Sequence, residues 1–449
     1  MSISTFTGIQ TSLRGLLAQQ RALDVTSHNI ANASTVGYTR QEATLAASAP
    51  LPVYTSGGAT AGALGTGVDV QSYRRVRDQF LDLQYRGQNM TLGDQSARSD
   101  ALSQVELSFN EPGDNGIANA LEKFWDAWGD VTNGPEGAAA RQTLVDDARD
   151  VTQRINDLQA SLAGARQRAQ DEYVSLTQPG GQINQMRSEL ASTLNAIRSA
   201  EMTGSQPNDL YDRRDLLLDQ LSTMGQVSVT QSPGGSVDIS LGGVTIVDAD
   251  DTTGVATVPA GAFPHRGSPT GGKLGALISL GWPGGPIDSY QTELAAMAQS
   301  LSDSVNAVYG ATGTNFFTFG VGTSGLPEIK LNEPAISSTT VVGGLGGQSD
   351  NSLALAISNL RGGDADKRYQ QLVTRMGNEV AQASRSQATA RVLTDNLSDR
   401  RESVSGVSLD EEMTNIIRFQ RAYQASARAM STTDEMLDTL INRAGRVGL

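Results

Sequence analysis

The sequence predicts a mainly α-helical protein with a smaller β module: terminal coiled-coil helices, an α-helical bundle domain and an inserted antiparallel β domain. Three observations lead to this prediction. Both ends of the chain carry apolar residues at heptad-like spacing, and long segments between them have helical periodicity. Residues 226–248 instead alternate β-branched and polar side chains around glycine-rich turns, which is typical of a small antiparallel meander.

Composition and charge favour several slender modules over one large compact core. Apolar residues make up 38% of the 449 residues and aromatic residues 5%, while 48 residues are glycine. The net charge of −14 lies in residues 51–400, because residues 1–50 carry +1 and residues 401–449 carry −1. Nearly neutral ends can pack together, whereas an acidic middle stays solvated and argues against binding nucleic acid.

The first predicted element is a helix with an apolar stripe, on which Gln20 and Ser27 also lie. The stripe residues, which we expect to form an assembly interface, are Phe6, Ile9, Leu13, Leu16, Leu23 and Ile30. The segment 29–40 follows, NIANASTVGYTR. Asn29 and Asn32 favour local bonds from side chain to backbone, and Gly37 permits a turn before Tyr38. We therefore expect the helix to end in a polar turn.

The middle of the chain is predicted to be mostly helical, with a β excursion. The expected helices are 73–110, 116–129, 136–176, 181–202, 208–223, 286–309 and 364–404. Residues 249–271 and 311–350 are rich in Gly, Ser and Thr, and we assign them to the β module or to loops on it. The expected domains are a terminal coiled-coil domain (1–50 and 405–449), a helical domain (51–225, 272–310 and 351–404) and an outer β-rich domain (226–271 and 311–350).

The last predicted element is a helix from about Leu409 to about Arg443. Ser408 and Glu411 have the spacing of a capping box, and Gly445 follows the helix. Its stripe, the second half of the expected assembly interface, contains Leu409, Met413, Ile416, Tyr423, Met430, Leu437 and Ile441. The stripe at the other end of the chain is its obvious partner. Two interpretations stay open: a pair within one subunit, or a pair that also packs on identical neighbours.

Two segments resemble ligand-binding motifs, but each lacks a residue that its motif requires. Residues 267–274, GSPTGGKL, have the glycines and Lys273 of a phosphate-binding loop, but Leu274 stands where a hydroxyl is needed for Mg²⁺. Residues 248–254, DADDTTG, resemble a calcium loop, but the glycine is displaced and Pro259 stands where a bidentate Glu is required. The residues before 267 also lack the pattern of a buried strand, and a solvated turn explains residues 248–254 better, so we expect no cofactor and no metal site.

The sequence offers no constellation that indicates a reaction. It has no cysteine, and neither of its histidines, His28 and His265, has a carboxylate or serine nearby in sequence that would suggest a relay. Trp125 and Trp128 lie three residues apart on a predicted helix, which is ordinarily a core face. The N-terminal sequence lacks a basic leader and an apolar segment, and no apolar run reaches membrane-spanning length. We therefore predict a non-enzymatic protein that does not insert into a membrane.

The two ends of the chain resemble a known family. The segment NIANASTVGYTR is similar to the N-terminal signature of flagellar rod, hook and hook-associated proteins, and residues 405–442, SGVSLDEEMTNIIRFQRAYQASARAMSTTDEMLDTLIN, resemble their C-terminal helix. Three internal segments resemble the hook-associated members: NDLYDRRDLLLDQLS (208–222), EGAAARQTLVDDARDVTQRIN (136–156) and GGKLGALISL (271–280). The resemblance covers most of the chain, but not residues 226–271 and 311–350.

The resemblance implies a structural subunit of the bacterial flagellum at the junction between hook and filament. Its terminal helices would form the inner layer of a tube, and its partners would be identical copies in a ring, the hook protein, a second, filament-side hook-associated protein and an export chaperone on the C-terminal helix. It also implies an extracellular location, reached by flagellar type III export without a cleaved signal peptide. Two alternatives stay open: a hook or distal-rod subunit, and a secreted protein with an active middle domain.

Overall fold

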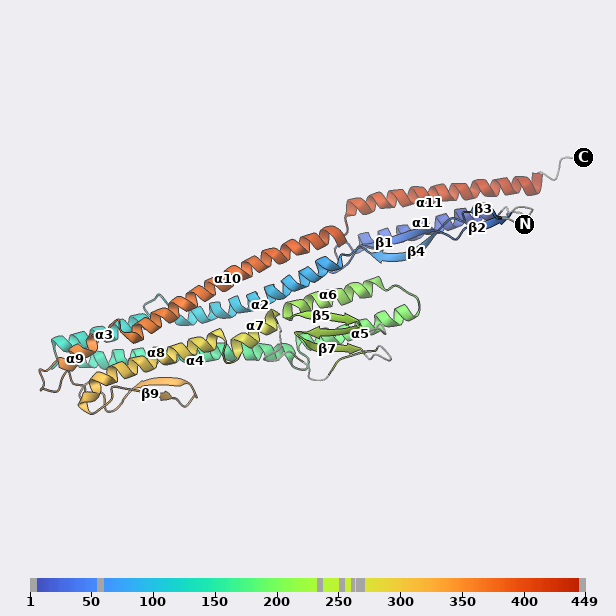
Figure 1. Cartoon of the computed structure of the whole chain (residues 1–449). Helices are drawn as coiled ribbons and strands as arrows, with labels where there is room; N and C mark the ends of the chain where they lie inside the picture. The colour runs from blue at the N-terminus through green and yellow to red at the C-terminus, as the bar shows by residue number, and fades with distance from the viewer. Residues whose placement is uncertain are drawn as a thin grey trace, which may run out of the picture.

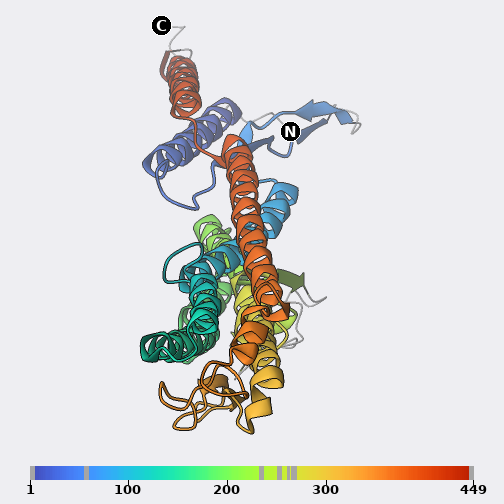
Figure 2. The same cartoon turned by 90° about the vertical axis from the view of Figure 1, so that its left-hand side faces the viewer.

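The computed structural model describes residues 6–54, 60–231, 237–249, 255–259, 263 and 271–443. The molecule is a long rod with both chain ends at the same tip (Figure 1). Seen after a quarter turn, α10 runs along the rod from the terminal helices toward the opposite tip (Figure 2). The predicted fold class is confirmed, because long helices dominate and the sheets are small and antiparallel.

The helices agree with the sequence periodicity at most of their ends. They are α1 (Thr7–Ala31), α2 (Gln79–Phe109), α3 (Ile117–Asn133), α4 (Ala138–Thr177), α5 (Gln182–Met202), α6 (Asn208–Met224), α7 (Gly272–Gly281), α8 (Pro286–Tyr309), α9 (Ser352–Ser358), α10 (Asp364–Ser405) and α11 (Leu409–Asp438). A short 3₁₀ turn, Gly310–Thr312, follows α8, and a π-helical turn, Thr439–Arg443, follows α11. The predicted cap is present, because the Ser408 side chain accepts a hydrogen bond from the backbone N–H of Glu411.

The largest departure from the sequence analysis lies between residues 41 and 75, which we left without secondary structure or assigned to helix. They form the strands β1 (Gln41–Ala47), β2 (Leu51–Tyr54), β3 (Thr60–Leu64) and β4 (Val68–Arg75). Strand β1 pairs with β4 and β2 with β3, so the segment is an antiparallel arm, of which β1 and β4 lie beside α1 and the β2–β3 hairpin extends away from it (Figure 2). The helix expected from residue 73 therefore begins only at Gln79, because β4 continues to Arg75.

The β module predicted as one domain consists of two separate sheets. Strands β5 (Val227–Gln231), β6 (Val237–Leu241), β7 (Val244–Ala249) and β8 (Ala256–Thr257) form an antiparallel meander in sequence order, as the alternating pattern of 226–248 predicts. Strands β9 (Phe317–Val321) and β10 (Pro327–Leu331) form a hairpin elsewhere, against α4 and α8. The two sheets lie apart along the rod because each covers a different stretch of helix (Figure 1).

The helical domain is held by one continuous apolar core that runs through α2 to α10 and the inner faces of both sheets. Its largest buried side chains are aromatic: Trp128, Phe124 and Phe316 are fully buried, and the rings of Trp128 and Phe316 lie 5.3 Å apart. Trp125 is also buried and donates its indole N–H to Asp366. The two tryptophans are therefore core residues, as their helical spacing predicts.

Candidate assembly interface

The two terminal helices pack against each other as an antiparallel pair, apart from the helical domain (Figure 1). Gly8 lies beside Thr433 and Gly15 beside Ser426, and a Cβ atom added to either glycine would come within 3.1 Å of the facing side chain. The side chains at a helix contact set the distance between the axes, so small residues allow a close approach. The contact between α1 and α11 is thus made mainly by small residues, and large apolar side chains have little room between the two helices.

Burial on the pair confirms this description. The buried residues of α1 are Ala18, Ala22, Thr26 and Asn29, and those of α11 are Glu412 and Leu437. Ala18 and Ala22 are only 2% exposed. The seam between the helices therefore buries mostly methyl groups and polar atoms.

The predicted stripe residues divide into two groups. Leu437 is buried, and seven others are half-buried beside the partner helix: Ile9, Leu16, Leu23, Ile30, Ile416, Tyr423 and Met430. The remaining five are exposed: Phe6, Leu13, Leu409, Met413 and Ile441. The structure adds three exposed apolar residues that the heptad assignment missed, Leu17, Ile417 and Met436. Leu17 and Ile417 each follow a stripe residue, so a wider stripe than strict heptad spacing would have included them.

The signature turn after α1 is built around the Asn29 side chain. Its amide donates to the backbone carbonyl of Gln41 (2.9 Å), and its Oδ1 accepts from the Gln41 N–H (3.0 Å) and from the Tyr38 hydroxyl (2.8 Å). Asn32 donates to the carbonyl of His28 and ends the helix. Both polar atoms of the buried Asn29 amide thus have partners, which fixes the direction in which the chain leaves α1.

Gly37 lets the same turn approach the helical domain. It has a φ of +82°, and a Cβ atom there would lie 3.2 Å from Leu216 of α6. A larger residue would therefore be strained and crowded at once. Nearby, the N–H of Val76 donates to the carbonyl of Arg40, and the N–H of Arg40 to that of Ser405. The chain crosses between the two parts of the rod before α2 and after α10, and these backbone hydrogen bonds tie both crossings to the signature turn.

We call the region where these crossings meet the signature turn the joint. Helix α6 presents a row of carboxylates to it. Asp209, Asp212, Asp215 and Asp219 are spaced three, three and four residues apart, so they lie along one face of the helix. All four belong to the segment NDLYDRRDLLLDQLS, which we singled out only by its resemblance. The spacing of its acidic residues was the available signal for a docking face.

The first two carboxylates hold the signature turn. Asp209 accepts from the Gln41 amide (3.0 Å) and lies 3.4 Å from the imidazole Nε2 of His28. Asp212 accepts from the backbone N–H of Thr39 (3.0 Å). Tertiary structure thus places a carboxylate beside His28, which sequence neighbours did not predict, and the contact links α1 to α6.

The next two carboxylates hold arginines from three other segments. Asp215 lies 2.9 Å from Arg75 at the end of β4 and 2.8 Å from Arg77. Asp219 lies 2.8 Å from Arg401 of α10. These side chains are at most 20% exposed, so the ion pairs are largely shielded from solvent. Such a network is costly to break, because removing one partner leaves a buried charge without compensation.

Burial and ion pairing shift the acidic groups of the joint in opposite directions. Burial raises the pKa of Asp212 above its ordinary value, although Thr39 and Arg75 partly oppose the shift. Burial would also raise the pKa of Asp215, but Arg214, Arg77 and Arg75 together lower it below the ordinary value. Asp215 is therefore the carboxylate that the surrounding arginines keep ionised.

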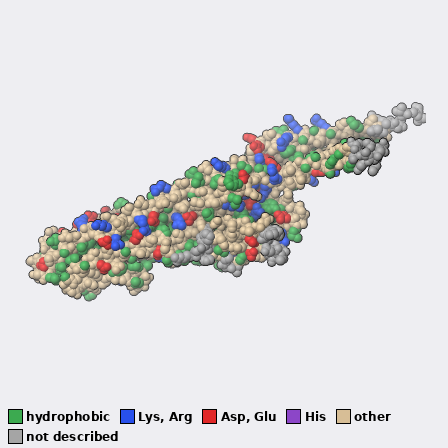
Figure 3. Space-filling model, in the orientation of Figure 1, with side chains coloured by type: hydrophobic (Ala, Val, Ile, Leu, Met, Phe, Trp, Pro, Cys, Tyr) green, Lys and Arg blue, Asp and Glu red, His purple; other side chains and the backbone are tan. Residues whose placement is uncertain are grey.

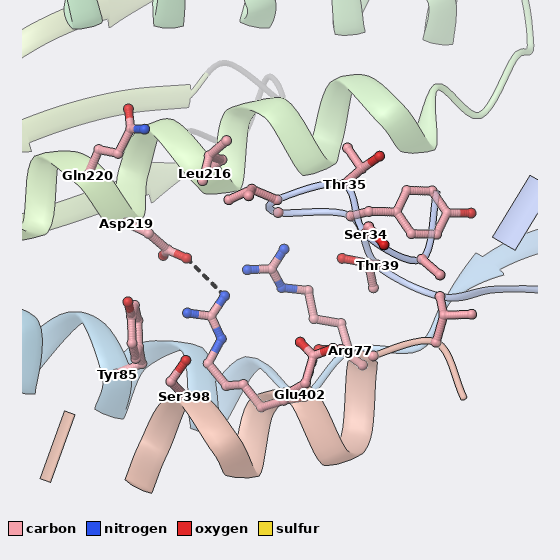
Figure 4. Close-up of a pocket in the computed structure, with 18 of the residues that line it drawn as sticks. Ser34, Thr35, Thr39, Arg77, Tyr85, Leu216, Asp219, Gln220, Ser398 and Glu402 are labelled. Atoms are coloured by element: carbon pink, nitrogen blue, oxygen red, sulfur yellow. Dashed lines mark hydrogen bonds and ion pairs between the residues drawn. The ribbon is translucent and has the colours of Figure 1, made fainter. Parts of the chain in front are cut away.

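A hollow of about 490 Å³ opens beside this network. Figure 4 shows that its labelled side chains come from the turn after α1 (Ser34, Thr35, Thr39), from α2 (Tyr85), from α6 (Leu216, Asp219, Gln220) and from α10 (Ser398, Glu402), with Arg77 from the segment before α2. Three of the charged groups along it are in ion pairs, Arg77 with Asp215 and Arg401 with Asp219. The hollow is part of the joint between the terminal pair and the helical domain.

The structure describes only part of the two segments that resemble ligand-binding motifs. Lys273 forms an ion pair with Glu172 (2.6 Å), and Leu274 is buried at the start of α7. Gly267, His265 and residues 250–254 of the calcium-like segment lie outside the described residues. Across the described ranges, no group of three or more His, Asp or Glu residues could hold a metal ion, and no helix is long and apolar enough to cross a membrane.

Three family models match separate parts of the chain. Residues 9–39 match the flagella basal body rod protein family, residues 102–317 match the flagellar hook-associated protein FlgK helical domain, and residues 401–443 match the flagellar basal body rod FlgEFG protein C-terminal family. The two outer matches cover the terminal pair, and the middle match covers most of the helical domain.

Curated relatives match nearly the whole chain. Flagellar hook-associated protein 1 of Bacillus subtilis is 32% identical, over 98% of this chain and 99% of that protein. The proteins of the same name from Salmonella typhimurium and Escherichia coli are 24% and 23% identical, over 97% of this chain and 99% of each relative. The solved structure of the flagellar hook junction protein FlgK from Burkholderia pseudomallei covers 53% of this chain and 47% of that chain, with 24% identity and a TM-score of 0.45.

Proposed function

The chain belongs to the flagellar hook-associated protein 1 family, and we propose that it is a structural subunit of the junction between the hook and the filament of the bacterial flagellum. Proteins of this family are components of the external flagellum. The subunit would assemble through its terminal helices into a ring, with no catalytic role. The observation that carries the proposal is the terminal pair, which closes mainly on small residues and leaves several of its large apolar residues exposed.

The exposed apolar side chains of the pair support self-assembly. Met413 is 53% exposed, Met436 62% and Leu13 40%, although all three lie on ordered helices. Burying one such side chain fully contributes about 1.5–3 kcal/mol. Several buried at once on neighbouring subunits would offset the entropy lost on ordering the contact. We therefore propose that the exposed stripe residues contact identical copies, and that the half-buried ones hold the pair together.

The separate parts of the rod suggest different positions in the assembled tube. The terminal pair with its β arm would form the inner layer of the tube, the helical domain the next layer, and the two separate sheets the outer surface. The signature turn, with Asn29, Asn32, Gly37 and Tyr38, would then act as the joint that sets the angle between inner and outer layers. The carboxylates of α6 hold this joint from the side of the helical domain.

A subunit at the junction between hook and filament would have a different protein on each side. The subunit would contact the hook protein on one side and a second hook-associated protein on the filament side. An export chaperone would cover the stripe of α11 before secretion by the flagellar type III route, without a cleaved signal peptide. The stripe residues left exposed on α11 are suitable for both chaperone and neighbour, since the two would bind at different times.

Deletion of the gene tests the proposal. We expect cells with hooks but without filaments, and monomeric flagellin in the culture medium. Cells without hooks would move the assignment to a hook or distal-rod subunit. Normal filaments would overturn a role in the axial structure. Electron microscopy of the cells and an immunoblot of the medium provide both readouts, and complementation with the intact gene is the control.

A further inference from the structure

The exposed charges of α11 are sorted into bands along the helix axis. The middle of the helix carries only basic residues, and its last turns carry only acidic ones. The middle band consists of Arg418, Arg421 and Arg428; the last band consists of Asp434, Glu435 and Asp438. All six side chains are exposed. Basic side chains on the free edge of α11 are visible in Figure 3.

Within the described residues, none of these six charges forms an ion pair, whereas the arginines of the joint do. Arg418 lies over the neighbouring Phe419 ring, and Asp438 accepts a hydrogen bond from Asn442. The first turn of α1, which lies opposite the acidic band, carries no charge. Opposite the basic band, α1 contributes the exposed Arg21 and Asp24. The pair therefore presents a net basic middle and an acidic end.

Two of the three acidic residues at the start of α11 are used inside the subunit, and the third, Asp410, is exposed. Glu411 forms an ion pair with Arg40, and Glu412 is buried beside Asn29. They belong to the joint, so the acidic band at the end of α11 is the one left free for a neighbour.

We propose that neighbouring copies pack side by side with an axial stagger that places the basic band of one α11 beside the acidic end of the next. The band centres are about 13 residues apart, which corresponds to about 20 Å along a helix that rises 1.5 Å per residue. This inference rests on the proposed self-assembly and adds its register. Exposed Met413, Ile417 and Met436 supply apolar area, and the charges select the alignment, as flanking charges do in coiled coils.

Packing without stagger would be disfavoured by the same charges. Three arginines would face three arginines, and three carboxylates would face three carboxylates. Like charges across an interface weaken association, whereas opposite charges attract and set the register. The pattern of α11 thus favours a staggered, head-to-tail contact, which continues from copy to copy along a helical path, so that the subunits of the junction would form one turn of a helix rather than a flat ring.

Cysteine cross-linking of the full-length protein in assembled flagella tests the register. The chain has no cysteine, so new ones are unique. Gln424→Cys and Met436→Cys are exposed positions that leave all six charges in place. With a short bis-maleimide, we expect the double variant to give a ladder of oligomers and each single variant to stay monomeric. Dimers of the single variants would overturn the stagger. Absence of the protein from purified hooks and filaments would instead reject the proposed function.

Charge reversal supplies a second test. Changing the three arginines to Glu, or the three acids to Lys, is expected to reduce filament attachment roughly tenfold, because one band then faces its own sign. Combining both sets in one chain restores opposite pairing, so attachment should return. Unchanged attachment in the single-band variants, or no recovery in the combined variant, would overturn the proposal. Levels of secreted protein provide the control for export.

Discussion

The helical domain and the terminal pair bury opposite kinds of residue. The domain encloses Trp128, Phe124 and Phe316 in a continuous core, whereas the pair encloses Ala18 and Ala22 and leaves Leu, Met and Phe side chains in solvent. The domain also exposes some large apolar side chains, Leu107 and Met202 among them, but it has a continuous aromatic core that the pair lacks. The comparison therefore separates a part held by a large core from a part held by a close contact between two helices.

Truncation in the helical core should have the largest effect on the isolated subunit. Trp128→Ala removes a fully buried ring that contacts Phe316 and Phe124. We expect a loss of about 3–5 kcal/mol in the free energy of unfolding, as for other large aromatic residues in cores. Urea unfolding followed by circular dichroism measures the change. A loss below about 1 kcal/mol would mean that the aromatic cluster does not hold the domain together.

Substitutions in the joint should have the next largest effect on the free energy of unfolding, and the effect should differ between Asp215 and Asp212. Asp215→Asn leaves the buried Arg75 and Arg77 short of a charge partner, so we expect a loss of roughly 3–5 kcal/mol at neutral pH. Asp212→Asn is the matched control. Arg75 loses this partner but keeps Asp215, the Asn side chain can still accept from the Thr39 N–H, and it carries no charge that burial disfavours, so the loss should be smaller.

The contributions of Asp215 and Asp212 to the free energy of unfolding change with pH in opposite directions. The pKa of Asp215 is lowered in the folded chain, so its contribution is present above its unfolded pKa and is lost as the pH falls through the folded value. The pKa of Asp212 is raised, so its contribution is present below its unfolded pKa and is lost as the pH rises through the folded value. The deficit of Asp215→Asn should therefore shrink below about pH 4. A deficit that persists into strong acid would contradict the ionised network.

Overpacking the terminal seam should have an intermediate effect. Ala22→Leu adds carbon atoms where α1 and α11 approach closely, and we expect a cost of about 1–3 kcal/mol confined to these helices. Hydrogen exchange of the α1 and α11 amides reports it locally. Leu17→Ala on the exposed side is the control and should leave exchange nearly unchanged. Equal effects of both substitutions would contradict a seam of small residues.

Polar substitution on the exposed stripe should have the smallest effect on the subunit. Met413→Asp changes a side chain that is 53% exposed, so the free energy of unfolding should change by less than about 0.5 kcal/mol. The same variant should lose filament attachment, because the apolar side chain is expected to be buried by a neighbour. Motility and electron microscopy measure attachment. Normal filaments would remove the exposed stripe from the assembly interface. Lys330→Glu on β10 is a control for adding an acidic residue far from the stripe.

Local periodicity predicted most of the helices and the meander of residues 226–248. The pattern of side chains within a helix or strand decides which face can be buried, and this information is contained in neighbouring residues. The β arm of residues 41–75 escaped prediction because glycine-rich turns interrupt its alternation, and its pairing joins strands far apart in sequence. The separation of the two sheets was not predicted, because residues 249–271 and 311–350 are both rich in Gly, Ser and Thr and were assigned to one β module.

The sequence by itself determined that the two ends of the chain form amphipathic helices suited to pair, and that Asn29, Gly37 and Tyr38 form a turn after the first. Only the tertiary structure decided which apolar residues face the partner helix. Alanine and leucine both fit a heptad stripe, and the close approach at Gly8 and Gly15 favours small residues at the seam, although Leu437 is buried near the end of α11. It also decided the joint, because the ion pair of Arg75 with Asp212 links residues that are 137 positions apart. Such a contact depends on where the chain returns, which local sequence does not specify.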